Sequence, residues 1–348
     1  MDLIKLMKEA VSHQASDLHL CAGMPPVLRI DGQLRGLSMP PVSAEELRAM
    51  IMSVLNDGQK EKFDENWELD CSLDVRGVGR FRVNVHRQRG AVEAAFRVIH
   101  EQVRSIRNLG LPPVVEDLCR RESGLILLTG PTGSGKTTTL AAMLDTINAS
   151  RSCMIITIED PIEFLHRNKR SIIKQRELMT DTKSFSVALR ESLRQDPDII
   201  AVGEMRDLET IRTALTAAET GHLVLATLHT PDVAQTIDRI MDVFPPHQQD
   251  QVRIQLAASL TAIIAQQLLP IPGDKGRVVA AEVLLATPAV RQVVRSKKTE
   301  QLATIMQTSY EAGMVTMDKA LKNLYQQGLI SFDDAIAKCK FPENFEQI

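Results

Sequence analysis

The sequence predicts an α/β protein in which a small N-terminal α+β domain precedes a larger α/β nucleotide-binding domain with a mainly helical end. Three observations support this fold class. The first hundred residues are rich in strand patterns, short apolar runs alternate with helical segments from Leu125 onward, and a glycine-rich motif follows the first of those runs. Short uninterrupted apolar runs are typical of strands buried on both faces of a parallel sheet.

The composition excludes several other classes. Hydrophobic residues make up 44% and charged residues 24% of the 348 residues, as in folded globular proteins. A net charge of −3 and 3% aromatic residues argue against a nucleic-acid partner. The longest uncharged stretch, 256–273, is interrupted by glutamines and prolines, so we expect no direct membrane insertion. Five scattered cysteines lack metal-binding spacing, so we expect reduced, mostly buried thiols.

The N-terminal domain is predicted to begin with a helix and to continue as two groups of strands. Residues 1–14 have the spacing of an amphipathic helix and lack the features of a signal peptide. Asp31 and Gly32 form a hairpin-turn signal between two short strands. A helical pattern at 43–56 separates this group from a three-strand meander. The expected strands are 16–20, 27–30, 33–37, 71–75, 80–88 and 91–99.

Four regions are expected along the chain. The segment 105–124 contains paired prolines and few periodic apolar residues, which favours a linker. Beyond it, the apolar runs that predict strands of the α/β core are 125–130, 153–158, 198–203 and 222–228. The expected regions are therefore an N-terminal domain at 1–104, the linker at 105–124, the core at 125–286 and a helical C-terminal region at 287–348.

The strongest functional signal is GPTGSGKT at 130–137, which fits GxxxxGK[ST] between a predicted strand and a predicted helix. Glycines let backbone N–H groups turn toward phosphate oxygens, and the helix N-terminus favours negative charge. Lys136 would reach the β- and γ-phosphates, and the Thr137 hydroxyl would bind Mg²⁺. The predicted nucleotide site consists of Gly130, Pro131, Thr132, Gly133, Ser134, Gly135, Lys136, Thr137 and Thr138.

Carboxylates follow two of the other predicted strands. Glu204 ends one strand, where it would bind the metal or orient the attacking water. Glu163 follows the strand at 153–158 and is the candidate general base, although the two glutamates are partly exchangeable between these roles. For Glu159 and Asp160, a function near the metal and a capped turn are equally compatible with the sequence.

Two histidines lie at the ends of the predicted strand 222–228: one is its first residue and the other follows its last residue. His222 and His229 are seven residues apart, too far on one short strand to share a metal ion. We expect His229 to act as a γ-phosphate sensor or in a subunit contact, and the same roles are open to His222.

The motifs GPTGSGKT, TIEDPIE, LRQDPDIIAVGEMRD and GHLVLATLHT resemble, in this order, the Walker A, Asp box, Walker B and His box of the secretion ATPase superfamily. SDLHL, PPVLRIDGQL, GRFRVNVHRQRG and the near-terminal PENF resemble its PilT branch, the retraction motors of type IV pili. The resemblance covers almost the whole chain. It implies a PAS-like domain followed by a RecA-like P-loop ATPase domain with a helical C-terminal part.

The resemblance also implies a biological setting. The expected protein hydrolyses ATP with Mg²⁺ as a homohexamer and powers pilus retraction and twitching motility. It would bind the inner-membrane pilus platform protein and the pilus machinery from the cytoplasm, at the inner-membrane face. Because the N-terminal domain of one subunit closes over the nucleotide of the next, Arg82 and Arg97 are expected to reach the γ-phosphate in trans, with Arg80 as a further candidate.

One motif departs from the PilT pattern. The PilT motif AIRNLIRE corresponds to AVRQVVRS at 289–296, where Ser296 replaces the final acid. We expect this segment to remain an amphipathic helix. Because of this departure, an accessory retraction paralogue stays open as an alternative to a main retraction motor. A motor for pilus assembly or type II secretion and a nucleotide-binding adaptor are two further alternatives.

Overall fold

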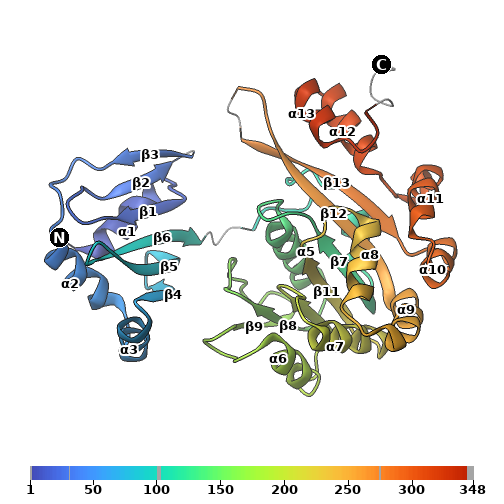
Figure 1. Cartoon of the computed structure of the whole chain (residues 1–348), viewed down its shortest axis with the longest axis horizontal. Coiled ribbons are helices and arrows are strands. Elements are labelled where there is room, and N and C mark those ends of the chain that lie inside the picture. Colours follow the sequence, from blue (N-terminus) through green and yellow to red (C-terminus); the bar gives the residue numbers. More distant parts are fainter. Residues whose placement is uncertain (1, 31, 100–102, 274–275, 343–348) are drawn as a thin grey trace. The chain divides into compact units, whose positions relative to one another are not determined.

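The chain forms two units, each with its own β-sheet and hydrophobic core (Figure 1). The computed structural model describes residues 2–30, 32–99, 103–273 and 276–342. The first unit comprises Met1–Gln102 with Glu163–Leu165, and the second comprises Val103–Ile162 with His166–Ile348. The PENF motif lies outside the described residues from Glu343 onward. The predicted fold class is confirmed, whereas the four expected region boundaries stay predictions.

The first unit contains a six-stranded antiparallel sheet in the order β3-β2-β1-β6-β5-β4. The predicted opening helix, hairpin and meander are confirmed. The elements are α1 (Leu3–Ser12), β1 (Asp17–Leu20), β2 (Val27–Ile30), β3 (Gln33–Gly36), α2 (Ala44–Val54), α3 (Asp57–Asn66), β4 (Glu68–Val75), β5 (Gly79–Gln88) and β6 (Ala91–Ile99).

The helix α3 is an element that the sequence pattern did not predict. Phe63 is its one buried residue among those described, so α3 lacks the apolar period by which a helix is recognised. Its start is instead specified by a capping box, in which the side chains of Asn56 and Gln59 each accept a hydrogen bond from the backbone N–H of the other residue.

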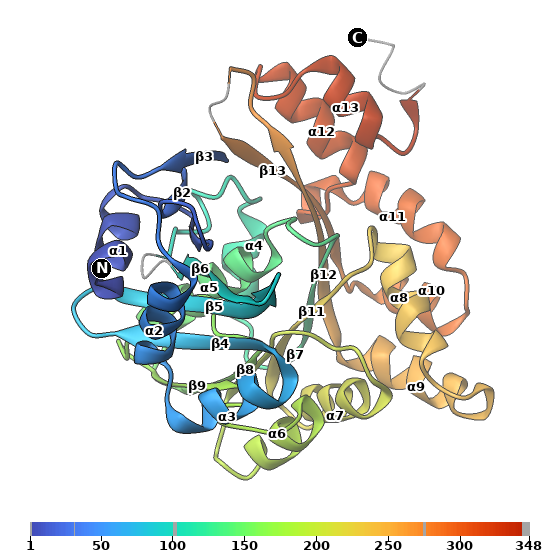
Figure 2. The same ribbon diagram turned by 60° about the vertical axis from the view of Figure 1, so that its left-hand side comes forward.

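The two faces of the first sheet differ in polarity. On one face α2 packs against β6 and α3 against β4 (Figure 2), and side chains such as Leu18, Phe81 and Phe96 are fully buried. The opposite face is polar because side chains alternate along each strand. One cross-strand row on that face, aligned by the strand register, contains Arg29, Asp17, Arg97, Arg82 and Ser72.

The second unit contains a seven-stranded sheet in the order β13-β12-β7-β11-β10-β8-β9. Its strands are β7 (Gly124–Thr129), β8 (Met154–Glu159), β9 (Ile172–Glu177), β10 (Ile199–Val202), β11 (Leu223–Leu228), β12 (Leu260–Pro270) and β13 (Arg277–Leu285). Its helices up to β12 are α4 (Val114–Leu118), α5 (Lys136–Ser150), α6 (Phe185–Ser192), α7 (Leu208–Glu219), α8 (Val233–Asp242) and α9 (Pro246–Ser259). The helices after β13 are α10 (Pro288–Arg295), α11 (Leu302–Thr308), α12 (Met317–Gln326) and α13 (Phe332–Lys338).

The second sheet is parallel except at one edge. All residues of β7, β10 and β11 are buried, as the uninterrupted apolar runs predicted. The sequence did not predict β9, β12 or β13, and β13 is antiparallel to β12. The polar second half of β9 hides its strand pattern. In β12, Gln266 lies within the apolar run, where its backbone oxygen is close to Gly130 of the phosphate loop and its side chain donates to Thr139 of α5.

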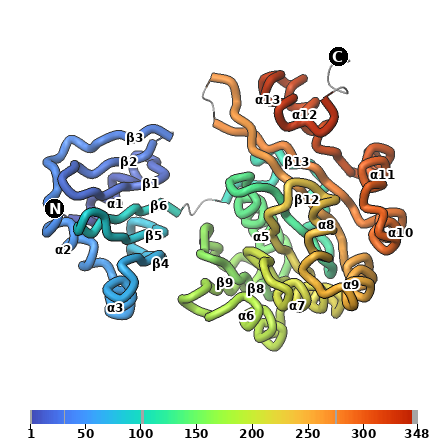
Figure 3. Tube along the Cα trace, viewed as in Figure 1, coloured from blue at the N-terminus to red at the C-terminus, as the bar shows by residue number. Residues whose placement is uncertain are grey.

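The described residues beyond β13 are mainly helical, as predicted, and α12 packs against β13 (Figure 3). In α10 the buried residues are Val290, Val293 and Val294, which confirms the amphipathic helix. No helix in the described part of the chain is long and apolar enough to cross a membrane. All five cysteines are free thiols, but only Cys119 is buried, so the expectation of mostly buried thiols is wrong. The other four cysteines are only partly buried.

Candidate active site

Polar groups converge at the carboxyl edge of the second sheet. The glycine-rich loop follows β7, Glu204 follows β10, and His229 follows β11. Because β7, β11 and β10 are neighbouring parallel strands, their carboxyl ends meet at one edge. The structure connects Lys136, His229 and Glu204 there through side-chain contacts.

The shape of the phosphate loop depends on glycine at two positions. Gly130 has φ +139°, and a Cβ on it would lie 2.3 Å from the carbonyl oxygen of Gln266 and 2.6 Å from Oγ of Ser134. Gly135 has φ +92° and caps the N-terminus of α5. Other residues rarely adopt these conformations. The loop therefore keeps its backbone close to β12 and directs the first turn of α5 toward the same edge.

Lys136 is buried against the loop itself. Its Nζ donates to the carbonyl oxygens of Gly130 at 2.7 Å and Pro131 at 2.9 Å, and lies 3.5 Å from Nδ1 of His229. Because a lysine ammonium group only donates hydrogen bonds, Nδ1 acts as the acceptor in this contact. The proton of the neutral ring is then on Nε2, which lies 3.2 Å from Oε1 of Glu204. His229 thus connects the phosphate loop to the carboxylate after β10.

Glu204 also forms an ion pair with Arg206. Nε of Arg206 lies 2.5 Å from Oε1 of Glu204. Burial raises the pKa of the Glu204 carboxyl, but the hydrogen bonds from Arg206 and His229 and the charge of Arg206 outweigh it, so the pKa lies below its ordinary value. The same hydrogen bond raises the pKa of Arg206. Glu204 is therefore an ionised carboxylate at neutral pH.

The groups at this edge fit a magnesium ion. Thr137, the second residue of α5, and Glu204 offer hydroxyl and carboxylate oxygens, the donor class that Mg²⁺ prefers. Within the described residues, the buried hydroxyl groups of Thr129 and Ser134 have no hydrogen-bond partner. These two oxygen atoms, one at the end of β7 and one in the loop, therefore keep unused hydrogen-bonding capacity. The expected metal-binding roles of Thr137 and Glu204 stay predictions.

The carboxylates after β8 have separate surroundings. Oε1 of Glu159 accepts hydrogen bonds from Oγ1 of Thr157 at 2.6 Å and Nε2 of Gln175 at 2.9 Å, which favours a structural role. Asp160 and Glu163 are exposed. Glu163 lies in the three-residue segment that belongs to the first unit, so its place beside the phosphate loop stays a prediction.

The structure separates the two histidines. His222 precedes β11, and its Nδ1 lies 3.0 Å from the carbonyl oxygen of Ala217 at the end of α7. The strand β11 lies between His222 and His229, and seven extended residue steps separate them by about 23 Å. Within one chain, His229 alone of the pair therefore lies at the carboxyl edge.

The candidate arginines lie on the polar face of the first unit. Arg82 forms a bidentate ion pair with Asp70, with the shortest contact at 2.7 Å, and Nε of Arg97 donates to Asp17 at 3.0 Å. Arg82 and Arg97 are direct cross-strand partners, and Arg80 is two residues from Arg82 on the same face. The structure thus gathers the arginines that were predicted to act in trans, and that role stays a prediction.

Two residues at this edge were not predicted from the sequence to belong to the site. Arg206 is two positions after Glu204, and this spacing was an available signal for an ion pair. Gln266 donates from Nε2 to Oγ1 of Thr139 at 2.8 Å, behind the loop. The available signal for Gln266 is a polar side chain within an apolar run. From the sequence alone, this side chain indicates only that the uncharged stretch is a poor membrane span.

A phosphate loop on the central strands of a parallel sheet, next to an ionised carboxylate that follows a buried strand, defines a P-loop nucleotide-binding protein. A family model described as "Type II/IV secretion system protein" matches residues 1–273. The chain belongs to this family of secretion ATPases, and within it to the PilT type.

Curated relatives and solved structures agree with this assignment. The type IV pilus retraction ATPase PilT of Pseudomonas aeruginosa is 49% identical over 345 residues, which cover 99% of this chain and 100% of that protein. A twitching motility protein of Neisseria gonorrhoeae is 45% identical and covers 98% of this chain and 91% of its own length. A crystal structure of the retraction motor PilT with bound ADP matches the whole of both chains with a TM-score of 0.94 and 49% identity.

Proposed function

We propose that this chain is a Mg²⁺-dependent ATPase that powers type IV pilus retraction as a homohexamer, in which ATP hydrolysis rotates one domain against the other. The ring would act from the cytoplasm at the inner-membrane face, bound to the pilus platform protein. The observation that carries the ATPase assignment is the connected group Lys136, His229 and Glu204 at the carboxyl edge.

Each candidate residue has a role that its chemistry supports. The loop amides and Lys136 bind the phosphates, and Mg²⁺, held by Thr137 and Glu204, would neutralise charge on the phosphate oxygens. Glu163 activates the attacking water. Arg82 and Arg97 offset negative charge that develops on the γ-phosphate, supplied by a neighbouring subunit.

The coverage of relatives favours retraction over secretion. The PilT match spans essentially all of both chains. In contrast, this chain covers 53% of the type II secretion system protein E of Aeromonas hydrophila, at 35% identity. The chain therefore shares the full length of the retraction ATPase and about half that of the secretion protein.

The proposal is tested with Lys136→Ala in the purified full-length protein and in the host. Loss of the ammonium group should abolish ATP turnover while the fold is retained, and cells that carry this variant should be heavily piliated but unable to twitch. Lys174→Ala, an exposed lysine on β9, is the matched control and should behave as wild type. Normal ATP turnover by Lys136→Ala would overturn the assignment of the phosphate site.

Ser296 supports a second candidate, an accessory retraction ATPase, because it replaces the acid of the retraction motif. Ser296 caps the C-terminus of α10, and its Oγ donates to the carbonyl oxygen of Gln292 at 2.9 Å. Expression of this chain in cells that lack every other retraction ATPase distinguishes the candidates. Restored twitching indicates a main motor, and twitching that needs a second ATPase indicates an accessory one.

A further inference from the structure

The segment that carries Glu163 is held at both ends by side chains of β9. The backbone N–H of Ile162 donates to Oε2 of Glu177 at 3.1 Å, and that of His166 donates to Oε1 of Gln175 at 2.8 Å. Gln175 and Glu177 are two residues apart on one strand, so their side chains leave the same face. We call Gln175 and Glu177 the β9 clamp.

The spacing of the β9 clamp indicates that the segment between its two backbone partners is not extended. The two side chains leave β9 about 7 Å apart, whereas the four residue steps between their backbone partners span about 13–14 Å when extended. Ile162 is also buried at 4% exposure, which fixes the residue directly before Glu163. Glu163 is thus the first residue of a short loop with a fixed starting point.

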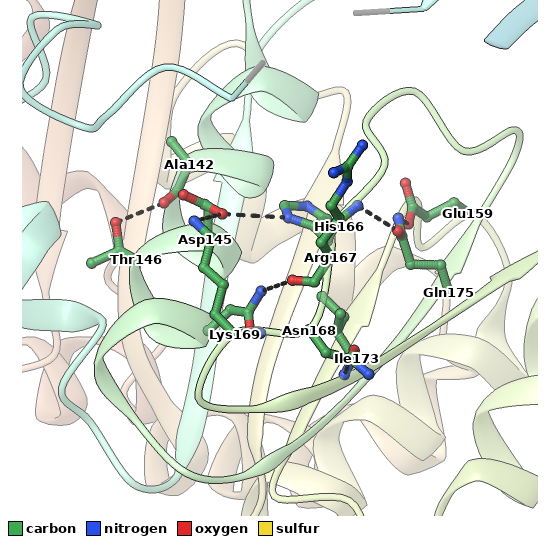
Figure 4. A network of polar contacts seen from close by, with 11 residues as sticks. Ala142, Asp145, Thr146, Glu159, His166, Arg167, Asn168, Lys169, Ile173 and Gln175 are labelled. Carbon is green, nitrogen blue, oxygen red and sulfur yellow. Dashed lines mark hydrogen bonds and ion pairs between the residues drawn. The ribbon is translucent and has the colours of Figure 1, made fainter. Parts of the chain in front are cut away.

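The β9 clamp is itself held in place. Nε2 of Gln175 donates to Oε1 of Glu159 at 2.9 Å, and Figure 4 shows Gln175 between His166 and Glu159. Glu177 is buried, and its Oε1 accepts a hydrogen bond from Oγ1 of Thr180 at 3.1 Å. Side chains with several partners keep one rotamer, so they hold the backbone that they bind in one place.

The phosphate-loop helix α5 holds the end of this segment and the residues that follow it. Nδ2 of Asn148 donates to the carbonyl oxygen of Arg167 at 2.8 Å, and Oδ1 accepts from the backbone N–H of Lys169 at 3.1 Å. Asp145 pairs with Nζ of Lys169 at 2.7 Å and lies 4.0 Å from Nδ1 of His166 (Figure 4). These contacts fix the end of the segment relative to α5, the helix that begins at Lys136.

We propose that Gln175 and Glu177 are positioning residues for ATP hydrolysis, which act by fixing the backbone on both sides of Glu163. The inference rests on the proposed role of Glu163 as the base that activates water. A general base must lie within hydrogen-bond reach of the water, and a misplacement of about 1 Å can lower the rate up to a hundredfold. Neither clamp residue needs to touch nucleotide for this effect.

Steady-state ATP hydrolysis by the full-length protein provides the first test. Gln175→Ala and Glu177→Ala should each lower kcat about tenfold or more, while KM and the binding of a fluorescent ATP analogue change less than about twofold. Glu177→Gln should retain most of kcat, because its amide oxygen still accepts the N–H of Ile162. Lys174→Ala on the other face of β9 is the control.

A background that lacks the base separates positioning from general stability. In Glu163→Gln, measured under single-turnover conditions, addition of Gln175→Ala should lower the residual rate less than about twofold, because residues that act through one group are not additive. A tenfold further loss in this background would overturn the proposal, as would unchanged kcat in both alanine variants of the clamp.

Two further outcomes distinguish failure of the inference from failure of the proposed function. If Glu163→Gln keeps wild-type kcat, the role of Glu163 and the clamp proposal both fall. If Glu163→Gln is impaired but the clamp variants are not, the clamp proposal alone falls. If an alanine variant unfolds, Glu177→Gln provides the test instead. Its amide oxygen should preserve kcat, so a Glu177→Gln protein that is folded and binds nucleotide but has lost kcat would contradict the proposal.

Discussion

Nε2 of His229 lies 3.2 Å from Oε1 of Glu204. On the opposite side of the ring, Nδ1 accepts a hydrogen bond from Lys136. One neutral imidazole therefore touches both the lysine of the phosphate loop and the carboxylate that follows β10. A shift of either group changes the hydrogen bond available to the other, which makes His229 a direct link between the two motifs.

Substitution of His229 should separate these motifs. We expect His229→Ala to lower kcat of ATP hydrolysis about tenfold to a hundredfold, because Glu204 loses a hydrogen-bond donor and Lys136 an acceptor. His229→Gln should retain more activity, since its amide nitrogen occupies a position similar to Nε2. The measurement is steady-state hydrolysis, with His247→Ala, an exposed position on α9, as the control. Equal losses in the alanine and glutamine variants would argue against a role for the Nε2 donor.

The arginines of the first unit should act across subunits. We expect Arg82→Ala and Arg97→Ala each to lower ATP turnover about a hundredfold or more while nucleotide binding is retained, because the missing cation no longer offsets charge in the transition state. Arg76→Ala, in the exposed turn before β5, is the matched control.

Mixed hexamers decide whether this action is in trans. Arg82→Ala and Lys136→Ala subunits should each be inactive alone, but mixing them should create interfaces in which an intact arginine faces an intact phosphate site. We expect mixing to restore part of the ATP turnover. Turnover that stays at the sum of the separate variants would show that Arg82 serves its own subunit.

Glu282 on β13 should give the protein a pH-dependent stability. Desolvation raises the pKa of its carboxyl above the ordinary value of 4.5, although the N–H groups of Val233 and Met317 donate to it. The folded state therefore holds the proton more tightly than the unfolded state. The free energy of unfolding then falls as pH rises from about 4.5 through the raised pKa, and the full penalty applies above it.

Glu282→Gln removes this titration and keeps an acceptor oxygen. Relative to wild type, we expect the variant to gain stability as pH increases from 4 to 8, because only the wild type bears the cost of a desolvated charge. Urea unfolding at several pH values measures the difference. A difference that does not change with pH would contradict the raised pKa.

The parts of the site that lie within one continuous motif could be predicted from sequence. The loop at 130–137 and the strand before Glu204 are local patterns, in which residue type and spacing specify both conformation and chemistry. The fully buried strands β7, β10 and β11 were predicted for the same reason, since a strand buried on both faces leaves an uninterrupted apolar run.

The parts that depend on pairing between distant segments were not predictable. Gln266 contacts Thr139 across 127 positions, and only the order of strands in the sheet places β12 beside β7. The β9 clamp was missed because Gln175 and Glu177 act on backbone N–H groups, which carry no residue-type signal. His229 could be nominated from sequence, but its simultaneous contact with Lys136 and Glu204 required the structure.

The close approach of Gly130 to the carbonyl oxygen of Gln266 has a consequence for how variants of this protein will behave. The backbone of β12 lies directly behind the phosphate loop. The strand β12 pairs with β13, against which α12 packs. Residues more than a hundred positions downstream thus lie directly against the loop. Substitutions that distort β12 should weaken nucleotide affinity although they touch no phosphate, and their effects would resemble those of Walker A variants.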